Sequence, residues 1–233
     1  MSVASAAQPR IAIVAGASGL VGRELLRRLL REPAYARVVA LTRRPLGVDH
    51  RLIEVPARYS ALDEVLSPAV SNDASVDAYC CLGTTLRTAG SEAAFREVDF
   101  DFVVAFGRWA TRHRARRLVV ISALGADARS RVFYNRVKGE MEDALRAMAP
   151  QTLVLVRPSL LDGDRAEQRR GESLALTLTR PLRGLLPASV RPVQVDDIAQ
   201  AMIDAALAAG APAVLRSAAL HGAAGRAYRA RRG

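Results

Sequence analysis

The chain is poor in cysteine and histidine, and this scarcity excludes several kinds of site. Its 233 residues contain two cysteines and three histidines. Cys80 and Cys81 are adjacent and would point to opposite faces of a strand, so they provide no disulfide framework. The three histidines are dispersed and give no spacing typical of a metal site. The cysteine content fits a reducing compartment, and we expect a cytoplasmic protein.

Long apolar runs are also missing. No stretch approaches the roughly 18 apolar residues that a membrane-spanning helix requires. Residues 1–10 lack the cationic start and apolar run of a signal peptide. Half of the residues are nevertheless apolar, which is ordinary for a protein with a substantial core. The sequence predicts a single domain over residues 1–233 that does not enter a membrane.

Aromatic residues are few, at 5% of the chain, while the formal net charge is +11. Proteins that bind nucleic acid gather basic residues on one face, often beside aromatic rings. Here the arginines are scattered in short clusters, such as Arg43-Arg44 and Arg169-Arg170. We therefore expect an arginine-rich surface and a small-molecule substrate, and no nucleic-acid partner.

Lysine is almost absent, since Lys138 is the single lysine among 34 basic residues. An ammonium is a compact point charge that arginine does not replace. Lys138 follows Tyr134 by four residues, and residues at this spacing share one face of a helix. The cation would favour the phenolate form of Tyr134 and lower its pKa from about 10. The pair is therefore a candidate for proton transfer.

Apolar strands alternate with helical segments over residues 10–156. This alternation is typical of an α/β protein with a parallel sheet, whose ligands bind at the carboxyl ends of the strands. The predicted strands are residues 10–15, 37–42, 52–55, 76–82, 118–122 and 152–156, and the main predicted helices are 19–31, 91–113 and 135–148. Beyond them we expect a small C-terminal substrate lobe over residues 159–221, with a short strand and a helix within 191–209. Residues 222–233 would form a mobile basic tail.

A glycine-rich turn joins the first predicted strand to the first helix, with the spacing Gly16-x-x-Gly19-x-x-Gly22. Glycines there let the backbone turn tightly and approach a pyrophosphate, which the amino end of the helix attracts. The position between a buried strand and an amphipathic helix predicts a dinucleotide site and a Rossmann-type doubly wound sheet. The candidate cofactor-binding residues of this turn are Gly16, Ser18, Gly19, Leu20, Val21 and Gly22.

The end of the second predicted strand indicates which dinucleotide is bound. An acidic residue there binds the ribose 2′-hydroxyl of NAD, whereas arginine accommodates the 2′-phosphate of NADP. The chain has Arg43 and Arg44 at this point and no acid before Asp49. Because a guanidinium group matches the geometry of phosphate, the two arginines favour NADP(H) over NAD(H). The alternative is that an arginine-rich chain places such a pair on any loop.

With the glycine turn, Ser122 and Tyr134-x-x-x-Lys138, the chain resembles the short-chain dehydrogenase/reductase superfamily. Further segments resemble its atypical branch, which is typified by the Tat-interacting protein oxidoreductases. These segments are Cys81-Leu82-Gly83-Thr84-Thr85, Gly125-Ala126-Asp127, Lys138-Gly139-Glu140 and Arg157-Pro158. The resemblance covers residues 11–164, with a weaker echo at 193–199.

This resemblance implies an oxidoreductase that reduces a carbonyl or oxidises the matching alcohol. Ser122 would hydrogen-bond the substrate oxygen, Tyr134 would transfer the proton, and Lys138 would also bind the nicotinamide ribose. The further cofactor candidates that it implies are Leu82, Gly83, Thr84 and Arg157. The chain also departs from the family pattern. Pro56-Ala57-Arg58 stands where relatives place an acid near the adenine, and Asp99 stands where many use an asparagine, so we assign Asp99 no role.

Two other functions stay open on the same fold. A non-catalytic sensor or scaffold would bind the dinucleotide without turnover. A nucleotide-sugar epimerase or dehydratase would keep its cofactor bound, although the segment after Pro158 is short for a nucleotide-sugar lobe. Cys81 is disfavoured as a nucleophile because no histidine lies near it in the sequence.

Two further patterns are expected to be structural. Asp196-Asp197 is typical of the cap and first turn of a helix, where acids favour the helix dipole. An apolar stripe in the helix predicted at 91–113 indicates either core or the interface of a homodimer. The stripe consists of Phe95, Val98, Phe102, Phe106 and Trp109.

Overall fold

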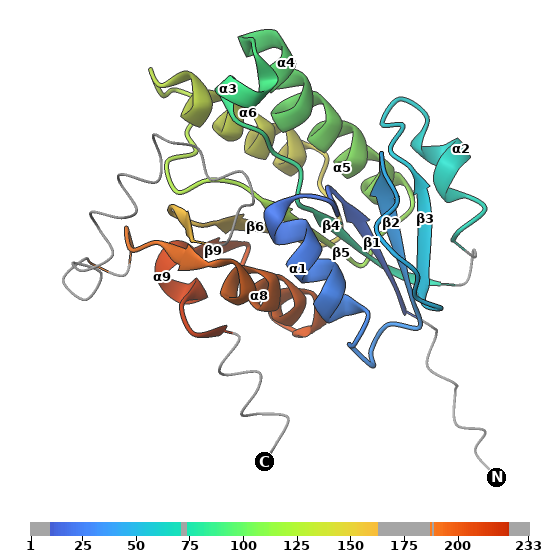
Figure 1. Cartoon of the computed structure of the whole chain (residues 1–233). Coiled ribbons are helices and arrows are strands. Elements are labelled where there is room, and N and C mark those ends of the chain that lie inside the picture. The colour runs from blue at the N-terminus through green and yellow to red at the C-terminus, as the bar shows by residue number, and fades with distance from the viewer. Residues whose placement is uncertain (1–9, 71–73, 163–186, 188, 224–233) are drawn as a thin grey trace.

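A parallel seven-stranded sheet runs through the molecule (Figure 1) in the order β3-β2-β1-β4-β5-β6-β9. The computed structural model describes residues 10–70, 74–162, 187 and 189–223. The strands of the sheet are β1 (Arg10–Ala15), β2 (Arg37–Thr42), β3 (Leu52–Pro56), β4 (Ser75–Cys80), β5 (Arg117–Ile121), β6 (Leu153–Arg157) and β9 (Val214–Arg216). The predicted α/β fold with a doubly wound parallel sheet is confirmed.

Helices cover both faces of the sheet because its central strands are apolar on both sides. Ala12 and Val14 of β1 pack under α1 (Leu20–Leu29) and α8 (Val195–Leu207). Ile11 and Ile13 face the opposite layer, which contains α2 (Leu62–Leu66), α5 (Phe102–Arg112) and α6 (Phe133–Ala147). Figure 1 shows the two layers on either side of the strands. Such burial on both faces is the expected setting of a parallel sheet.

The strand order reverses between β1 and β4, and this reversal positions the site. From β1 the chain extends the sheet through β2 and β3 on one side, and from β4 it extends it through β5 and β6 on the other. The loops that follow β1 and β4 therefore leave the sheet side by side in opposite directions. In open α/β sheets such a switch point forms the ligand crevice at the carboxyl ends of the strands.

The helix predicted at residues 91–113 is not one regular helix. The structure has α4 (Glu92–Arg96), a π-helical turn η1 (Glu97–Asp101) and then α5, with the short helix α3 (Leu86–Ala89) before them. From the predicted apolar stripe, Phe95, Phe106 and Trp109 are buried inside this chain. They belong to the core, which is the first of the two interpretations; the homodimer stays a prediction.

The C-terminal part of the described chain joins the main sheet. β9 pairs with β6, and α8 packs into the same core as α1, followed by α9 (Ser217–Leu220). β7 (Leu161–Asp162) and β8 (Val193–Gln194) form a separate two-stranded ribbon. Much of the predicted lobe 159–221 is thus part of the sheet and its helices, while 163–186, 188 and 224–233 lie outside the described residues.

The start of α8 differs in detail from its prediction. The residue at the cap is Gln194, and Asp196 and Asp197 lie in the first turn. Asp197 accepts a hydrogen bond from the backbone N–H of Gly222 at 2.9 Å, so it connects the segment after α9 to this helix. In the described ranges, no helix combines the length and apolar character needed to span a membrane.

Candidate functional site

The turn between β1 and α1 is built so that only glycine fits at two positions. Gly16 has φ +78°, and a Cβ there would lie 2.6 Å from the carbonyl carbon of Cys81. A Cβ on Gly22 would lie 2.1 Å from the carbonyl oxygen of Gly16. Real side chains do not reach such distances, so the glycines let the turn lie directly against the end of β4 and let α1 pack on the turn.

The amino end of α1 is suited to an anion. The helix begins at Leu20 after Gly19, with no side-chain cap and no acid in its first turn. Its first N–H groups therefore have no partner within the helix and carry the positive end of its dipole. Ser18 and Gly19 are exposed, whereas the Val21 side chain is buried in the core, so only its backbone faces the site. These residues fit the pyrophosphate of a dinucleotide.

The arginine pair follows β2 at the same end of the sheet. Arg43 and Arg44 are exposed, and the hydroxyl of Thr42 accepts a hydrogen bond from the Arg44 N–H at 3.2 Å. Tyr59 connects this loop to the glycine turn. Burial raises the pKa of Tyr59, while the charge of Arg43 and a hydrogen bond with the Gly16 backbone act in the opposite direction. The pKa of Tyr59 therefore responds both to Arg43 and to the backbone of the glycine turn.

Lys138 is buried one helical turn after Tyr134 on α6, and it contacts a carboxylate to which the sequence assigned no role. Its Nζ lies 2.8 Å from Oδ1 of Asp99, and the two side chains are 3% and 1% exposed. The other oxygen of Asp99, Oδ2, accepts a hydrogen bond from the Thr84 N–H at 2.7 Å. Burial acts to lower the pKa of Lys138, but Asp99 and Tyr134 outweigh it and the pKa is raised. The predicted pair is thus a trio that includes Asp99.

The loop after β4 lies against this trio. A Cβ on Gly83 would lie 3.4 Å from Oδ1 of Asp99 and 3.9 Å from Nζ of Lys138. Leu82 packs against the core, so the backbone of Gly83 and Thr84 forms the surface beside the buried ion pair. The structure therefore brings together Gly83, Thr84 and Lys138, and their cofactor-binding role stays a prediction.

Ser122 follows β5 and is buried, and its hydroxyl is directed to Glu142 on α6. Its Oγ donates a hydrogen bond to Oε1 of Glu142 at 2.5 Å. Although burial raises the pKa of Glu142, hydrogen bonds from Arg157 and Ser122 lower it overall, so the carboxylate is ionised and must be the acceptor. A serine hydroxyl has one proton. In this arrangement Ser122 can accept a hydrogen bond from a substrate but has no proton left to donate.

Arg157 contacts the same carboxylate. Its Nε donates to Oε1 of Glu142 at 2.7 Å and its Nη2 contacts Oε2, while Arg146 donates to Oε2 at 2.8 Å. The sequence analysis assigned Arg157 to the cofactor and did not identify Glu142. The available signal was the spacing, since Glu142 follows Lys138 by four residues on α6. The roles predicted for Ser122 and Arg157 stay predictions.

The two cysteine thiols have raised pKa values, which argues against a nucleophilic Cys81. Burial raises the pKa of Cys80 to about 12. Burial also raises the pKa of Cys81, the residue that packs against the glycine turn. A nucleophilic cysteine requires the opposite shift, because the thiolate is the reactive form.

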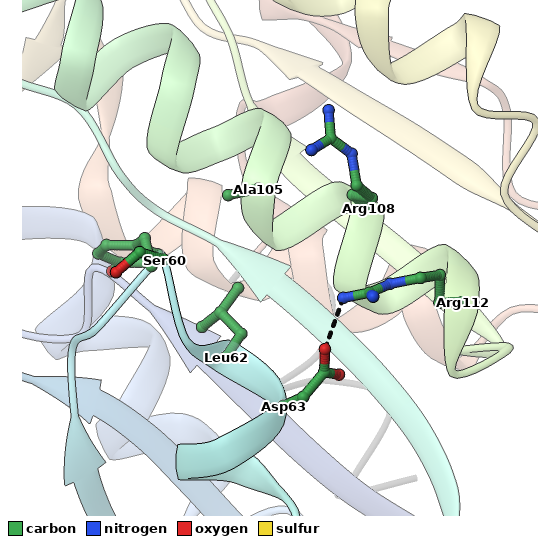
Figure 2. Close-up of a pocket in the computed structure, with 7 residues that line it drawn as sticks. Ser60, Leu62, Asp63, Ala105, Arg108 and Arg112 are labelled. Carbon is green, nitrogen blue, oxygen red and sulfur yellow. Dashed lines mark hydrogen bonds and ion pairs between the residues drawn. The ribbon is translucent and has the colours of Figure 1, made fainter.

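Two surface cavities lie near α5 and α6 rather than in the crevice. The first, of about 320 Å³, lies between α2 and α5 and is lined by Tyr59 and Arg108 among others. Figure 2 shows Arg112 reaching across it to Asp63, to which it donates a hydrogen bond at 2.7 Å. The second, of about 480 Å³, lies beside Glu142 and Arg157. Neither cavity is lined by the glycine turn or by Tyr134.

A family profile and similar sequences agree on the family of this chain. The profile of the NAD dependent epimerase/dehydratase family matches residues 12–212. The chain is 32% identical to Protein HTATIP2 of Rattus norvegicus over 204 residues, which cover 84% of this chain and 81% of that protein. It is 29% identical to the mitochondrial protein FMP52 of Candida albicans over 198 residues, or 82% of this chain and 85% of that protein.

A solved structure with the same fold is MoeE5 in complex with UDP-glucose and NAD. It superposes with a TM-score of 0.64 at 18% identity, covering 88% of this chain and 74% of that chain. At this identity the likeness concerns the fold. The FMP52 relatives correct one expectation, because their names place those proteins in mitochondria. The prediction of a cytoplasmic protein, which rested on cysteine content and the lack of a signal peptide, is therefore wrong.

Proposed function

This chain belongs to the NAD dependent epimerase/dehydratase family, in the branch that resembles HTATIP2, and from that premise we propose that it is an NADP(H)-dependent oxidoreductase. It would reduce a carbonyl group or oxidise the matching alcohol. The observation that supports this most directly is the buried Lys138, which lies beside the loop that follows β4 and one helical turn after Tyr134 on α6. A cofactor bound at the glycine turn would supply the hydride.

The residues of the chain would provide binding and the proton. Gly16, Gly19 and Gly22 would hold the pyrophosphate at the start of α1, and Gly83 and Thr84 would line the nicotinamide side. Tyr134 would donate its phenolic proton to the carbonyl oxygen as the hydride arrives at the carbonyl carbon. Lys138 would hold the ribose and balance the negative charge that develops on Tyr134.

We also propose that NADP(H) is preferred over NAD(H). Arg43 and Arg44 are exposed after β2, at the same end of the sheet as the glycine turn, and the charge of Arg43 acts to lower the pKa of Tyr59. An adenosine ribose placed there would carry its 2′-phosphate toward guanidinium groups, which bind phosphate in two-point geometry. In Arg43→Ala we expect the affinity for NADPH to fall about tenfold or more, as a loss of about 1.4 kcal/mol or more, with little change for NADH. Isothermal titration with both dinucleotides tests this, and an equal loss for both would remove Arg43 from the 2′-phosphate site.

The function itself is tested with Tyr134→Phe. Purified protein is first assayed with NADPH against a panel of aldehydes and ketones. Loss of the phenolic proton should reduce turnover by about 100-fold or more, because general acid catalysis contributes about 10²–10⁴. The affinity for NADPH should remain nearly unchanged. Turnover that survives the substitution would contradict the assignment of Tyr134.

A non-catalytic sensor is the second candidate, and one observation favours it. The proton of Ser122 is held by Glu142, so the hydrogen bond that would polarise a carbonyl is missing in this arrangement. NADPH binding without turnover of any carbonyl would support the sensor. An epimerase or dehydratase is the third candidate, since the profile that matches residues 12–212 is that of the NAD dependent epimerase/dehydratase family.

A further inference from the structure

We propose that Asp99 is a positioning residue that holds Lys138 in its charged form and fixes it against the loop lining the nicotinamide side. The inference rests on the proposed function for the identity of the ligand that Lys138 meets. Its structural basis is independent of that function, since it consists of contacts among three elements that are far apart in the sequence.

The π-helical turn η1 brings Asp99 to this position. It interrupts the helical segment between α4 and α5, and Asp99 is the buried residue of the turn. π-Helical turns are rare in proteins, and those that occur often lie at functional sites. From this turn one oxygen of Asp99 lies 2.8 Å from the Lys138 Nζ on α6, and the other accepts from the Thr84 N–H after β4. A single carboxylate therefore connects η1, α6 and the end of β4.

The charges around Lys138 make Asp99 the decisive partner. Asp99 from η1, Tyr134 from its own helix and Cys80 from β4 all act to raise the pKa of Lys138. Cys80 is a buried thiol whose pKa is raised to about 12. Asp99 is the carboxylate in direct contact with the ammonium, at 2.8 Å. Without it, burial would favour the neutral amine, because transfer from water penalises the charged form.

Lys138 can be observed by itself because the chain has one lysine. In protein labelled only with ¹³C,¹⁵N-lysine, the ε-carbon gives one resonance whose shift reports the ionisation of Lys138. In the wild type the titration midpoint of this resonance should lie above the ordinary lysine value of 10.5, since the pKa is raised. In Asp99→Asn, which keeps the shape and an acceptor for the Thr84 N–H, the titration midpoint should fall by about three pH units or more, the shift that full burial without a counter-ion produces.

Asp101→Asn is the matched control. It removes the same charge from the same π-helical turn, but Asp101 is exposed, so the Lys138 resonance should be unchanged. If Lys138 titrates in Asp99→Asn as it does in the wild type, the inference is overturned. If Asp99→Asn does not fold, a measurement on the wild type alone tests the inference. A buried, paired ammonium exchanges its protons slowly and gives a ¹⁵Nζ–H signal at neutral pH, and the absence of that signal would equally overturn the inference.

Cofactor titrations separate positioning from mere structural support. In Asp99→Asn the affinity for NADPH should fall by about tenfold more at about pH 9 than at about pH 6, because Lys138 loses its charge between these values. The wild type and Asp101→Asn should show no such dependence. An equal loss at both pH values would mean that Asp99 only supports the fold. If the wild type binds no NADPH while Lys138 still depends on Asp99, the proposed function fails and the ion pair stands.

Discussion

Glu142 shows how one buried carboxylate can organise several predicted site residues. It accepts hydrogen bonds from Ser122, Arg157 and Arg146, and its side chain is 1% exposed. These contacts come from the end of β5, the end of β6 and the last turns of α6. Removing the carboxylate would leave the charge of Arg157 without its partner in a place largely shielded from water. An uncompensated charge in such a place lowers the free energy of unfolding.

We expect Glu142→Gln to lower the free energy of unfolding at neutral pH by about 3 kcal/mol. This value is the lower end of the range for broken buried pairs, because Arg146 is partly exposed. The folded-state pKa of Glu142 lies below its ordinary value of 4.5. Its contribution is therefore complete above pH 4.5 and is lost as the pH falls through the folded-state value. In urea unfolding, the difference in free energy of unfolding between the wild type and Glu142→Gln should therefore become smaller in acid.

Asp143→Asn is the control for this prediction. Asp143 also pairs with Arg146, but its side chain is 65% exposed, so its loss should change stability little. The role given to the ionised carboxylate would be contradicted if the difference in free energy of unfolding between Glu142→Gln and the wild type stayed constant down to strongly acid pH.

At the level of residues, the sequence revealed what was rare or regularly spaced. Lys138 stood out as the single lysine, and its spacing from Tyr134 placed both on one helix face. Asp99 and Glu142 were missed because their importance lies in contacts with residues far away in the chain. An acid in a sequence is one of many, and burial beside a cation is a tertiary property that no local pattern contains.

At the level of elements, the strands were predicted closely and the interruptions were not. β1 and β2 begin and end where the apolar runs indicated. The π-helical turn η1 was predicted as ordinary helix, and the contact of its Asp99 with Lys138 joins residues that are far apart in the sequence. β9 has three residues and was missed, because its pairing with β6 rather than its length defines it.

The glycine turn permits a sharp test at this scale. In Gly22→Ala the new methyl group would lie 2.1 Å from the Gly16 carbonyl oxygen, so α1 must move away from β1. We expect a loss of about 3 kcal/mol in the free energy of unfolding, the upper part of the range for overpacking. The affinity for NADPH should fall about tenfold or more, because the helix end that faces the pyrophosphate shifts with it.

Gly210→Ala is the matched control, since its Cβ would meet nothing within 4 Å. Urea unfolding and isothermal titration of both variants give the comparison. If Gly22→Ala is as stable as Gly210→Ala, the close packing of α1 on the turn is not required for the fold.

For the whole molecule, the topology explains why residues scattered over the sequence form one site. The switch between β1 and β4 sets the glycine turn against Cys81, and the same loop continues to Thr84, which is tied to Asp99. The cofactor would therefore bridge both halves of the sheet. A ligand held by both halves stabilises the folded chain as a unit, because the unfolded chain has no such site.

This linkage predicts the response of the entire fold to NADPH. At about 100 times the dissociation constant, binding adds about 2.7 kcal/mol to the stability of the folded state. For a chain of this size that amounts to a rise of about 5–10 °C in the midpoint of thermal unfolding. NADH at the same concentration should raise the midpoint less, and Tyr134→Phe should respond to NADPH as the wild type does, since its hydroxyl serves the reaction rather than binding. Differential scanning calorimetry measures all three. A midpoint that NADPH leaves unchanged would mean that the glycine turn only packs α1 on the sheet, and the dinucleotide site would have to be withdrawn.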